Sequence, residues 1–166
     1  MENGFVYLFR HIAMLKITPH LRNYLLNKCI GKVSLTAEIK NEVYLGGQRF
    51  YIGEHVFINK FCRLFSGCSD ESAIILEDNV VLAMGVTLTT HTHHIGDSKR
   101  RAPRKTLLKP ITIKEGCWLG ANVTVLPGVT IGKGTVVGAG SVVIKDLEPN
   151  SVYVGTPARK VKDLES

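Results

Sequence analysis

Aliphatic residues recur at intervals of six along most of this chain of 166 residues. The longest regular series is Ile113, Leu119, Val125, Ile131, Val137 and Val143. Two upstream series are Ile52, Ile58, Leu64, Leu76, Leu82 and Leu88 and, displaced by one residue, Val33, Ile39 and Leu45. In the longer upstream series the position between Leu64 and Leu76 is occupied by a polar residue, Asp70. Because six residues are too few for a helical repeat, this period indicates a solenoid built of short strands.

A second series lies four residues after each aliphatic position and contains small or β-branched residues. Its members are Ala37, Val43, Val56, Cys62, Cys68, Val80, Val86, Cys117, Val123, Val129, Thr135 and Ser141. Simple strand alternation would not confine one position to small side chains. We therefore predict a triangular solenoid in which three hexapeptides form a coil, each giving one flat strand and one corner. Successive coils would stack ~4.8 Å apart, the usual distance between strands. At three hexapeptides per coil, about five coils fit between Val33 and Leu147.

Three of the four cysteines, Cys62, Cys68 and Cys117, occupy the small position of this repeat. A nucleophilic cysteine needs solvent access and a lowered pKa, and an interior position favours neither. We therefore predict that all three are structural, while Cys29 lies outside the repeat. The chain has no CxxC pair and no zinc-ligand spacing, which favours a reducing, cytoplasmic location.

The pattern divides the chain into residues 1–32, 33–147 and 148–166. In the first part, apolar residues recur at helical spacing on both sides of Pro19, which predicts two short amphipathic helices. Because the open end of a solenoid must be covered, we expect these helices to form a cap. The third part is a C-terminal tail. The apolar run Phe5–Phe9 is too short for a signal-peptide core or a membrane span, so membrane association is disfavoured.

Two segments of the solenoid depart from the repeat. Residues 66–73 form a polar patch, which we interpret as a small loop projecting from a corner. Residues 89–110 read TTHTHHIGDSKRRAPRKTLLKP and lack the repeat altogether. A long excursion from a rigid scaffold is typical of a loop that carries function. We therefore place the candidate site at this extended loop.

Basic residues in this loop account for much of the formal net charge of +7. They are Lys99, Arg100, Arg101, Arg104 and Lys105. A basic surplus is compatible with nucleic acid, a membrane surface or an anionic small ligand. No nucleic-acid-binding motif accompanies the cations, and no aromatic residues alternate with them to stack on bases. We therefore expect no nucleic-acid partner, and the role of the basic run stays open.

Three histidines, His91, His93 and His94, lie at the start of the loop. Two kinds of chemistry use histidine in such a place. A metal site would use several imidazoles as ligands. Acyl transfer needs one neutral imidazole as a general base, because its pKa lies near the working pH. The residues alone leave both possibilities open.

The run ITIKEGCWLGANVTVLPGVTIGKGTVVGAGSVVIKDLEPNSVYVGTPARKV, residues 111–161, resembles the C-terminal signature of the hexapeptide-repeat acyltransferases. It is most similar to the galactoside and maltose O-acetyltransferases and to acetyltransferases of polysaccharide synthesis. The resemblance implies an all-β fold, a left-handed parallel β-helix, and a homotrimer with active sites between subunits. It also implies acetyl-CoA as the co-substrate, no metal, and direct transfer to a sugar hydroxyl in a ternary complex.

The resemblance also implies roles for individual residues. The general base would be His91, with His93 as the alternative, and backbone N–H groups would stabilise the oxyanion. Asn59 would contact the acceptor. The residues matched to positions that bind CoA are Trp118, Ala121, Ala139, Ile144, Lys145, Arg159 and Lys162. Ile144 stands where threonine is common in the family, so a side-chain hydrogen bond from this position is not expected.

Several functions remain open at this stage. Residues 1–32 do not resemble the cap of the galactoside and maltose enzymes, which favours a glycan intermediate as the acceptor. The enzyme alternative within the family is an antibiotic acetyltransferase of the streptogramin type. A γ-type carbonic anhydrase shares the solenoid, but the three loop histidines are too crowded for its zinc ligands. The non-enzymatic alternative is a solenoid binding module whose basic loop binds an anionic partner.

Overall fold

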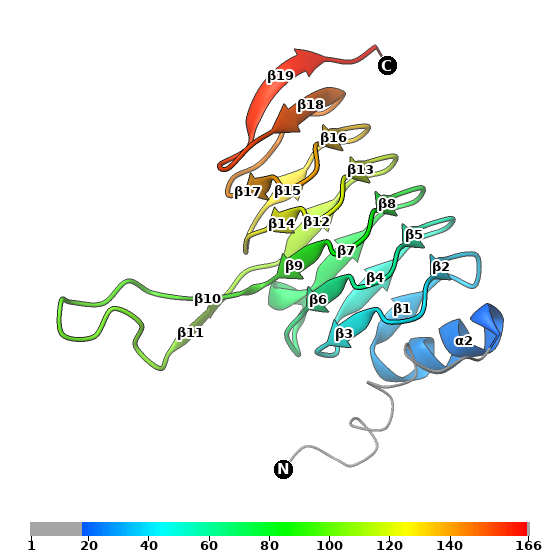
Figure 1. The fold of residues 1–166 in the computed structure, drawn as a ribbon. Helices are drawn as coiled ribbons and strands as arrows, with labels where there is room; N and C mark the ends of the chain where they lie inside the picture. Colours follow the sequence, from blue (N-terminus) through cyan, green and yellow to red (C-terminus); the bar gives the residue numbers. More distant parts are fainter. Residues whose placement is uncertain (1–17, 166) are drawn as a thin grey trace.

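A computed structural model describes residues 18–165, and these residues form a left-handed parallel β-helix with one helix at its N-terminal end (Figure 1). The predicted fold class is therefore confirmed. Three parallel sheets form the faces of a triangular prism, and the chain visits them in turn. In the described residues, no helix is both long enough and apolar enough to cross a membrane.

Each coil contributes one strand to each sheet. The first sheet contains β1 (Gly31–Val33), β4 (Phe50–Ile52), β7 (Ile74–Leu76), β12 (Ile111–Ile113) and β15 (Thr130–Ile131). The second contains β2 (Glu38–Ile39), β5 (Phe57–Ile58), β8 (Val81–Leu82), β13 (Trp118–Leu119) and β16 (Val136–Val137). Beyond the five coils this sheet is extended by β18 (Ser151–Val154), parallel to β16, and by β19 (Arg159–Asp163), antiparallel to β18. The third contains β3 (Tyr44–Gly46), β6 (Arg63–Phe65), β9 (Thr87–Thr89), β14 (Thr124–Val125) and β17 (Val142–Val143).

The aliphatic series forms the interior of the prism. In the third sheet, for example, Leu45 pairs with Leu64, Leu64 with Leu88, and Leu88 with Val125 on successive coils. These side chains are buried, as are their counterparts in the other two sheets. Burying each large aliphatic side chain contributes roughly 1.5–3 kcal/mol, so these columns are the main source of stability. Five coils are complete, and Leu147 starts a sixth by pairing with Ile131.

The small positions are also interior, with one exception. Cys62 and Cys117 are fully buried, and burial raises the pKa of both thiols, that of Cys117 to about 11. The prediction for Cys68 is wrong, because this side chain is exposed. Residues 66–73 leave the coil as the predicted loop and contain a short 3-10 turn, Asp70–Ser72. The six-residue spacing is therefore coincidental at Cys68 and at Asp70, because both residues lie in the loop and not in the coil.

One helix, α2 (Pro19–Cys29), covers the open end of the first coil. The first of the two helices predicted for residues 1–32 lies outside the described residues. Leu26 of α2 is buried, but Leu21 and Tyr24 are exposed, so the expected apolar face is only partly used. The buried polar residue Asn23 instead donates hydrogen bonds from Nδ2 to the carbonyl oxygens of Ala37, at 2.7 Å, and Ser34, at 3.1 Å.

All three irregularities of the repeat fall at one edge of the prism, where the third sheet gives way to the first. They are the one-residue displacement at 47–49, the loop 66–73 and the long excursion. The excursion forms an antiparallel ribbon of β10 (His91–His93) and β11 (Thr106–Leu108), called the arm below. Figure 1 shows the arm extending away from the solenoid. The predicted loop 89–110 is thereby confirmed.

Candidate active site at the root of the arm

Thr90 is the residue at which the chain leaves the solenoid for the arm. Its N–H still donates to the Phe65 carbonyl of the preceding coil, at 3.0 Å. Its own carbonyl accepts from the N–H of Lys109, the residue after β11, also at 3.0 Å. Thr90 is fully buried, whereas His91 beside it is exposed. A rigid, buried residue thus holds an exposed imidazole at the root of the arm.

The Thr90 hydroxyl orients the ring of His91. Its Oγ1 lies 3.1 Å from the Phe65 carbonyl oxygen and 3.3 Å from His91 Nδ1. A carbonyl can only accept, so the single hydroxyl hydrogen goes to Phe65. Thr90 Oγ1 then accepts from the N–H at Nδ1 of His91. In this tautomer Nε2 carries the lone pair, which is the arrangement that a neutral imidazole needs to act as a base.

His93 is oriented differently. Its Nδ1 lies 2.9 Å from the carbonyl oxygen of Pro103, so it donates within the arm and also leaves Nε2 with a lone pair. His91 and His93 project from the same side of β10, because residues two apart in a strand share a face. His91 lines a pocket at the arm root, and His93 does not. His94 follows β10 and is exposed.

This pocket, called the root pocket below, has a volume of about 540 Å³. Its lining residues come from the first three coils and the arm root: Tyr44, Gly46, Gly47, Phe65, Ser66, Gly67, Cys68, Thr89 and His91. The rings of Tyr44 and Phe65 lie side by side, with centroids 5.4 Å apart. Sequence reasoning did not identify Thr90, Tyr44 or Phe65 as site residues. The aromatic pair had a usable signal, since both residues flank aliphatic positions on successive coils.

Three of the predicted contact residues lie along the edge between the second and third sheets. Asn59 follows β5, Ala121 follows β13 and Ala139 follows β16. The last two stack directly, because Gly140 N–H donates to the Ala121 carbonyl at 2.8 Å. The side chain of Asn59 is used locally, its Oδ1 accepting from Lys60 N–H at 2.8 Å. Trp118 lies close to this edge in β13 and is 53% exposed, so its ring is free to contact a ligand.

The remaining predicted CoA contacts lie elsewhere on the upper coils. Ile144 and Lys145 follow β17, at the same edge as the arm root. Lys145 and Arg159 line a common pocket of about 310 Å³ at the C-terminal end. Within residues 18–165, neither these two cations nor Lys162 pairs with a carboxylate, whereas their neighbour Lys160 pairs with two. Cations without carboxylate partners suit phosphate groups, so these residues fit a phosphate-bearing nucleotide such as CoA.

His91 follows β9, the middle strand of the third sheet. All seven predicted CoA contacts lie on β13 and later elements, to one side of it along the prism axis. Asn59 and the aromatic pair lie on the other side. One chain therefore places the imidazole between a candidate cofactor region and a candidate acceptor region. Within one chain, however, the predicted site residues lie on two different edges of the prism. Asn59, Ala121 and Ala139 lie where the strands of the third sheet begin, whereas His91 and Lys145 lie where these strands end.

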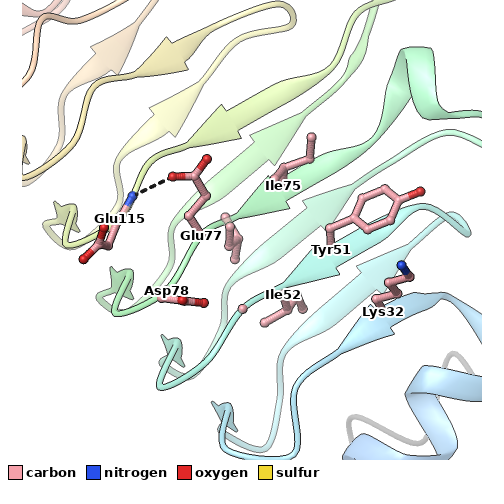
Figure 2. A pocket seen from close by; sticks show the side chains of 9 residues that line it. Lys32, Tyr51, Ile52, Ile75, Glu77, Asp78 and Glu115 are labelled. Carbon is pink, nitrogen blue, oxygen red and sulfur yellow. Dashed lines mark hydrogen bonds between the residues drawn. The ribbon is translucent and has the colours of Figure 1, made fainter.

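A second hollow lies on the first sheet and has a structural explanation (Figure 2). Its volume is about 370 Å³, and it includes the carboxylates of Glu77, Asp78 and Glu115. Glu77 accepts from the N–H of Glu115, at 3.1 Å, and from Lys114 Nζ, at 2.7 Å. Asp78 accepts from Glu54 N–H at 2.7 Å. These carboxylates thus join corners of adjacent coils. Over the part of the chain described, no group of three or more His, Cys, Asp or Glu residues could hold a metal ion.

Comparison with known proteins places this architecture in a family. Residues 110–145 match the family described as bacterial transferase hexapeptide (six repeats), and residues 66–90 match the hexapeptide repeat of succinyl-transferase. Galactoside O-acetyltransferase of Escherichia coli K12 is 33% identical over 144 residues, covering 86% of this chain and 68% of that enzyme. Galactoside O-acetyltransferase of Lactococcus lactis subsp. lactis is 35% identical over 153 residues, covering 89% and 71%.

A solved structure supports the same grouping. A hexapeptide-repeat-containing acetyltransferase from Vibrio cholerae O1 biovar eltor, complexed with acetyl-CoA, has a TM-score of 0.80 and 27% identity, covering 98% of this chain and 87% of that one. The chain defines a left-handed β-helical protein with an arm and a histidine at its root. It belongs to the hexapeptide-repeat acyltransferase family, which confirms the resemblance of residues 111–161. A Schizosaccharomyces pombe relative, 40% identical over 120 residues, is matched over only 56% of its length.

Proposed function

We propose that this protein transfers the acetyl group of acetyl-CoA to a hydroxyl of a sugar or glycan intermediate, with His91 as the general base. The observation that carries the proposal is the position of His91. Its ring is held by a buried threonine, lines the root pocket, and lies between the pocket and the coils that carry the candidate CoA contacts. The family relatives named as galactoside O-acetyltransferases support a sugar as the acceptor class.

The proposed reaction is a direct transfer. His91 Nε2 takes the proton of the acceptor hydroxyl as its oxygen forms a bond to the thioester carbonyl carbon. The C–S bond then breaks, CoA leaves as the thiolate, and the imidazolium returns its proton to the solvent or to the leaving thiolate. Trp118 would contact the pantetheine arm, while Lys145, Arg159 and Lys162 would bind phosphates. Each of these roles uses a side chain that is exposed in the chain.

A direct transfer needs no nucleophilic cysteine. Cys62 and Cys117 are buried thiols with raised pKa values, which disfavours a role as thiolates. Cys68 requires separate treatment, because it is exposed and lines the root pocket. The described residues that line this pocket include no Lys or Arg, and His91 is the basic side chain that shares the pocket with Cys68. Our proposal is a ternary complex of protein, acetyl-CoA and acceptor in which His91 activates the acceptor hydroxyl, and Cys68 is the residue to check.

We further propose that the active unit is a homotrimer. The candidate contacts lie on two edges of one prism, and cyclic packing of three prisms would bring one edge of each chain against the other edge of its neighbour. The arm supports this arrangement, because it extends from its own solenoid and carries Ile95, which is 87% exposed. A second chain would cover such a side chain.

An acceptor screen tests the proposed function. The protein is incubated with acetyl-CoA and a panel of mono- and oligosaccharides, and free CoA thiol is measured with time. The expected result is acceptor-dependent thiol release that His91→Ala abolishes. A protein that binds CoA but releases no thiol with any hydroxyl acceptor would contradict the proposal, and it would favour the non-catalytic binding module instead.

A further inference from the structure

The arm carries five basic side chains and one acidic side chain. The basic residues are Lys99, Arg100, Arg101, Arg104 and Lys105, and all of them are exposed. The acid, Asp97, is engaged locally, because its Oδ1 accepts from the N–H groups of Lys99, at 2.9 Å, and Arg100, at 3.1 Å. Within residues 18–165, none of the five cations forms an ion pair with a carboxylate. The arm is therefore a concentrated positive surface.

The end of the arm is an ordered turn. The N–H of Gly96 donates to the carbonyl oxygen of Arg101 at 2.9 Å, and Arg101 Nη1 donates back to the Gly96 carbonyl oxygen at 3.1 Å. A Cβ atom at Gly96 would lie 2.2 Å from the Arg100 carbonyl oxygen, so the turn needs glycine here. Nearer the root, His93 contacts the carbonyl oxygen of Pro103. A scaffold that is already ordered loses less conformational entropy when its side chains bind a ligand.

A neighbouring copy of the chain brings too few free carboxylates to neutralise the arm. Most acidic side chains in residues 18–165 pair with Lys or Arg of their own chain: Glu38, Glu42, Asp70, Glu77, Glu115, Glu148 and Asp163. Like Asp97, Asp78 and Asp146 accept from backbone N–H groups.

The described carboxylates left over are those of Glu54, Glu71 and Glu165, against five cations on the arm. In sequence, residues 1–17 add one acid, Glu2, and two cations, Arg10 and Lys16. Every chain of a homotrimer carries the same side chains, so the excess of positive charge persists in the proposed trimer. The arm therefore calls for an anion that the protein does not supply.

The cations are distributed along the arm. Lys105 is three residues from Leu108, which pairs with His91, and Lys99 is eight residues from His91 itself. At about 3.3 Å per residue of extended chain, they lie from roughly 10 Å to at most about 26 Å from the arm root. A monosaccharide at His91 is too short to reach the end of the arm. A flat lipid surface that contacts this end does not follow the arm back to His91.

We infer that the arm binds the acceptor along its length, and that the acceptor is an acidic glycan chain of several sugar units. This inference rests on the proposed function and narrows its acceptor class. One unit would present a hydroxyl to His91 Nε2, while the anionic groups of further units would contact the arm cations. Guanidinium and ammonium groups suit such anions, and the positive field would also speed the encounter. Nucleic acid fits less well, because the arm has no aromatic residue on which bases could stack.

Binding of labelled hexagalacturonate tests the inference without any acetyl transfer. Charge contacts depend little on the stereochemistry of the sugar, so this acidic hexamer is a suitable probe, and labelled maltohexaose is its neutral counterpart. Fluorescence anisotropy should show binding of the acidic hexamer, with a Kd that rises about tenfold or more between about 50 mM and 200 mM NaCl. Maltohexaose should bind at least about tenfold more weakly at low salt. Equal affinities for the two hexamers would overturn the inference.

Two charge-matched variants locate the binding surface. Lys99→Gln with Arg100→Gln, called the tip variant, should raise the Kd for hexagalacturonate about tenfold, because two charge-assisted contacts are lost. Lys28→Gln with Lys32→Gln, called the body variant, removes the same charge from exposed positions on α2 and β1 and should leave the Kd within about twofold. Circular dichroism spectra and melting temperatures establish that both variants are folded. Equal effects of the two variants would show that only net charge matters.

The length of the probe tests whether the ligand follows the arm. Galacturonate oligomers of one to six units should bind more tightly as they become long enough to reach Lys99, so the hexamer should bind about tenfold or more tightly than the dimer. In the tip variant this gain should be mostly lost. A hexamer that binds no better than the dimer in the wild type would contradict an acceptor laid along the arm.

Two further ligands test other occupants of the arm. The tip variant should bind acetyl-CoA within about twofold of the wild type, since CoA is assigned to the upper coils. A tenfold loss of acetyl-CoA affinity would assign the tip to the nucleotide of a neighbouring site and overturn the inference. Co-sedimentation with phosphatidylglycerol vesicles that is lost in the tip variant, without binding of the acidic hexamer, would assign it to a membrane and overturn the inference as well.

The outcomes separate this inference from the proposed function. Thiol release that depends on His91, with the same Kd for hexagalacturonate in the tip and body variants, refutes the inference and leaves the transferase. Binding of the acidic hexamer that depends on the tip, with no thiol release from any acceptor, supports the arm as a site for acidic glycans and refutes the transferase.

Discussion

The Oγ1 atom of Thr90 and the Nδ1 atom of His91 lie 3.3 Å apart at the root of the arm. The same hydroxyl lies 3.1 Å from the carbonyl oxygen of Phe65. These two contacts link the tautomer of an exposed imidazole to the backbone of the preceding coil. Thr90 is therefore a positioning residue in the proposed mechanism, and its effect on His91 can be measured separately from its effect on folding.

We predict that Thr90→Val, which keeps the side-chain shape but lacks the hydroxyl, lowers kcat about tenfold or more because the imidazole loses its tautomer preference. Thr90→Ser should restore most of the activity. The ¹⁵N chemical shifts of His91 report the tautomer directly. An unchanged ¹⁵N spectrum in a folded Thr90→Val variant would contradict the positioning role, whatever happens to kcat.

His91→Ala should lower kcat by roughly 10²–10⁴-fold and leave the affinity for CoA nearly unchanged, as expected for the loss of a general base. His93→Ala should lower kcat far less, because His93 does not line the root pocket. Steady-state kinetics of both variants and a CoA titration provide the measurements. If His93→Ala shows the large loss and His91→Ala does not, the base is His93.

The cysteines allow a test of direct transfer. Intersecting double-reciprocal plots are expected, and protein incubated with acetyl-CoA alone should carry no acetyl group. Peptide mass spectrometry at Cys68 is decisive, since this thiol is exposed at the pocket. A stoichiometric acetyl adduct on Cys68 would establish a covalent route and exclude direct transfer from acetyl-CoA to the acceptor.

Because of Cys117, the free energy of unfolding should decrease as the pH rises above 9. Burial raises the pKa of its thiol from 9.0 to about 11 in the folded protein. The unfolded chain therefore releases this proton first, and the contribution of Cys117 is complete below pH 9 and is lost as the pH rises toward 11. The free energy of unfolding should fall by about 1.4 kcal/mol per pH unit in this window.

Urea denaturation of the wild type and of Cys117→Ala measures this loss. The alanine variant should be modestly less stable at pH 8, since the position accepts small apolar groups. The difference between the two proteins should shrink above pH 9 and change sign before pH 11, because only the wild type loses the contribution of Cys117. A difference that stays constant over this range would show that the thiol is not protected by burial.

The trimer can be tested by its mass and by its shared sites. Light scattering should give three times the chain mass of 18.3 kDa. His91→Ala and Trp118→Ala chains, unfolded together and refolded as a mixture, should regain part of the activity, because mixed trimers would contain some intact sites. Variants refolded separately are the control. A stable, active monomer, or no recovery on mixing, would contradict a site shared between chains.

The cap offers a stability test independent of activity. Asn23→Ala removes the donor to the buried carbonyl oxygen of Ala37, while the Ser34 carbonyl oxygen still accepts from Ala37 N–H. We expect a loss of about 1–3 kcal/mol in the free energy of unfolding. His20→Ala, at an exposed position of the same helix, should change it by less than about 0.5 kcal/mol. Equal effects of the two substitutions would argue against polar capping by Asn23.

The six-residue period by itself determined the solenoid, its interior columns and the existence of the arm. It could do so because each aliphatic residue must reach the interior once per strand, so Leu64 and Leu88 could be assigned without any knowledge of their neighbours. The same reasoning was wrong for Cys68. Its spacing fits the period, but spacing alone does not show whether the chain still follows the coil.

Only the tertiary structure decided which residues meet at the site. Tyr44 and Phe65 are 21 residues apart and Phe65 and His91 are 26 apart, and the loop lengths between coils bring all three to one edge of the prism. The sequence also left His91 and His93 as alternatives, since they differ in their contacts and not in their residue type. Their hydrogen bonds to Thr90 and Pro103, and the position of the root pocket, depend on where the arm folds back, and no local pattern encodes that packing.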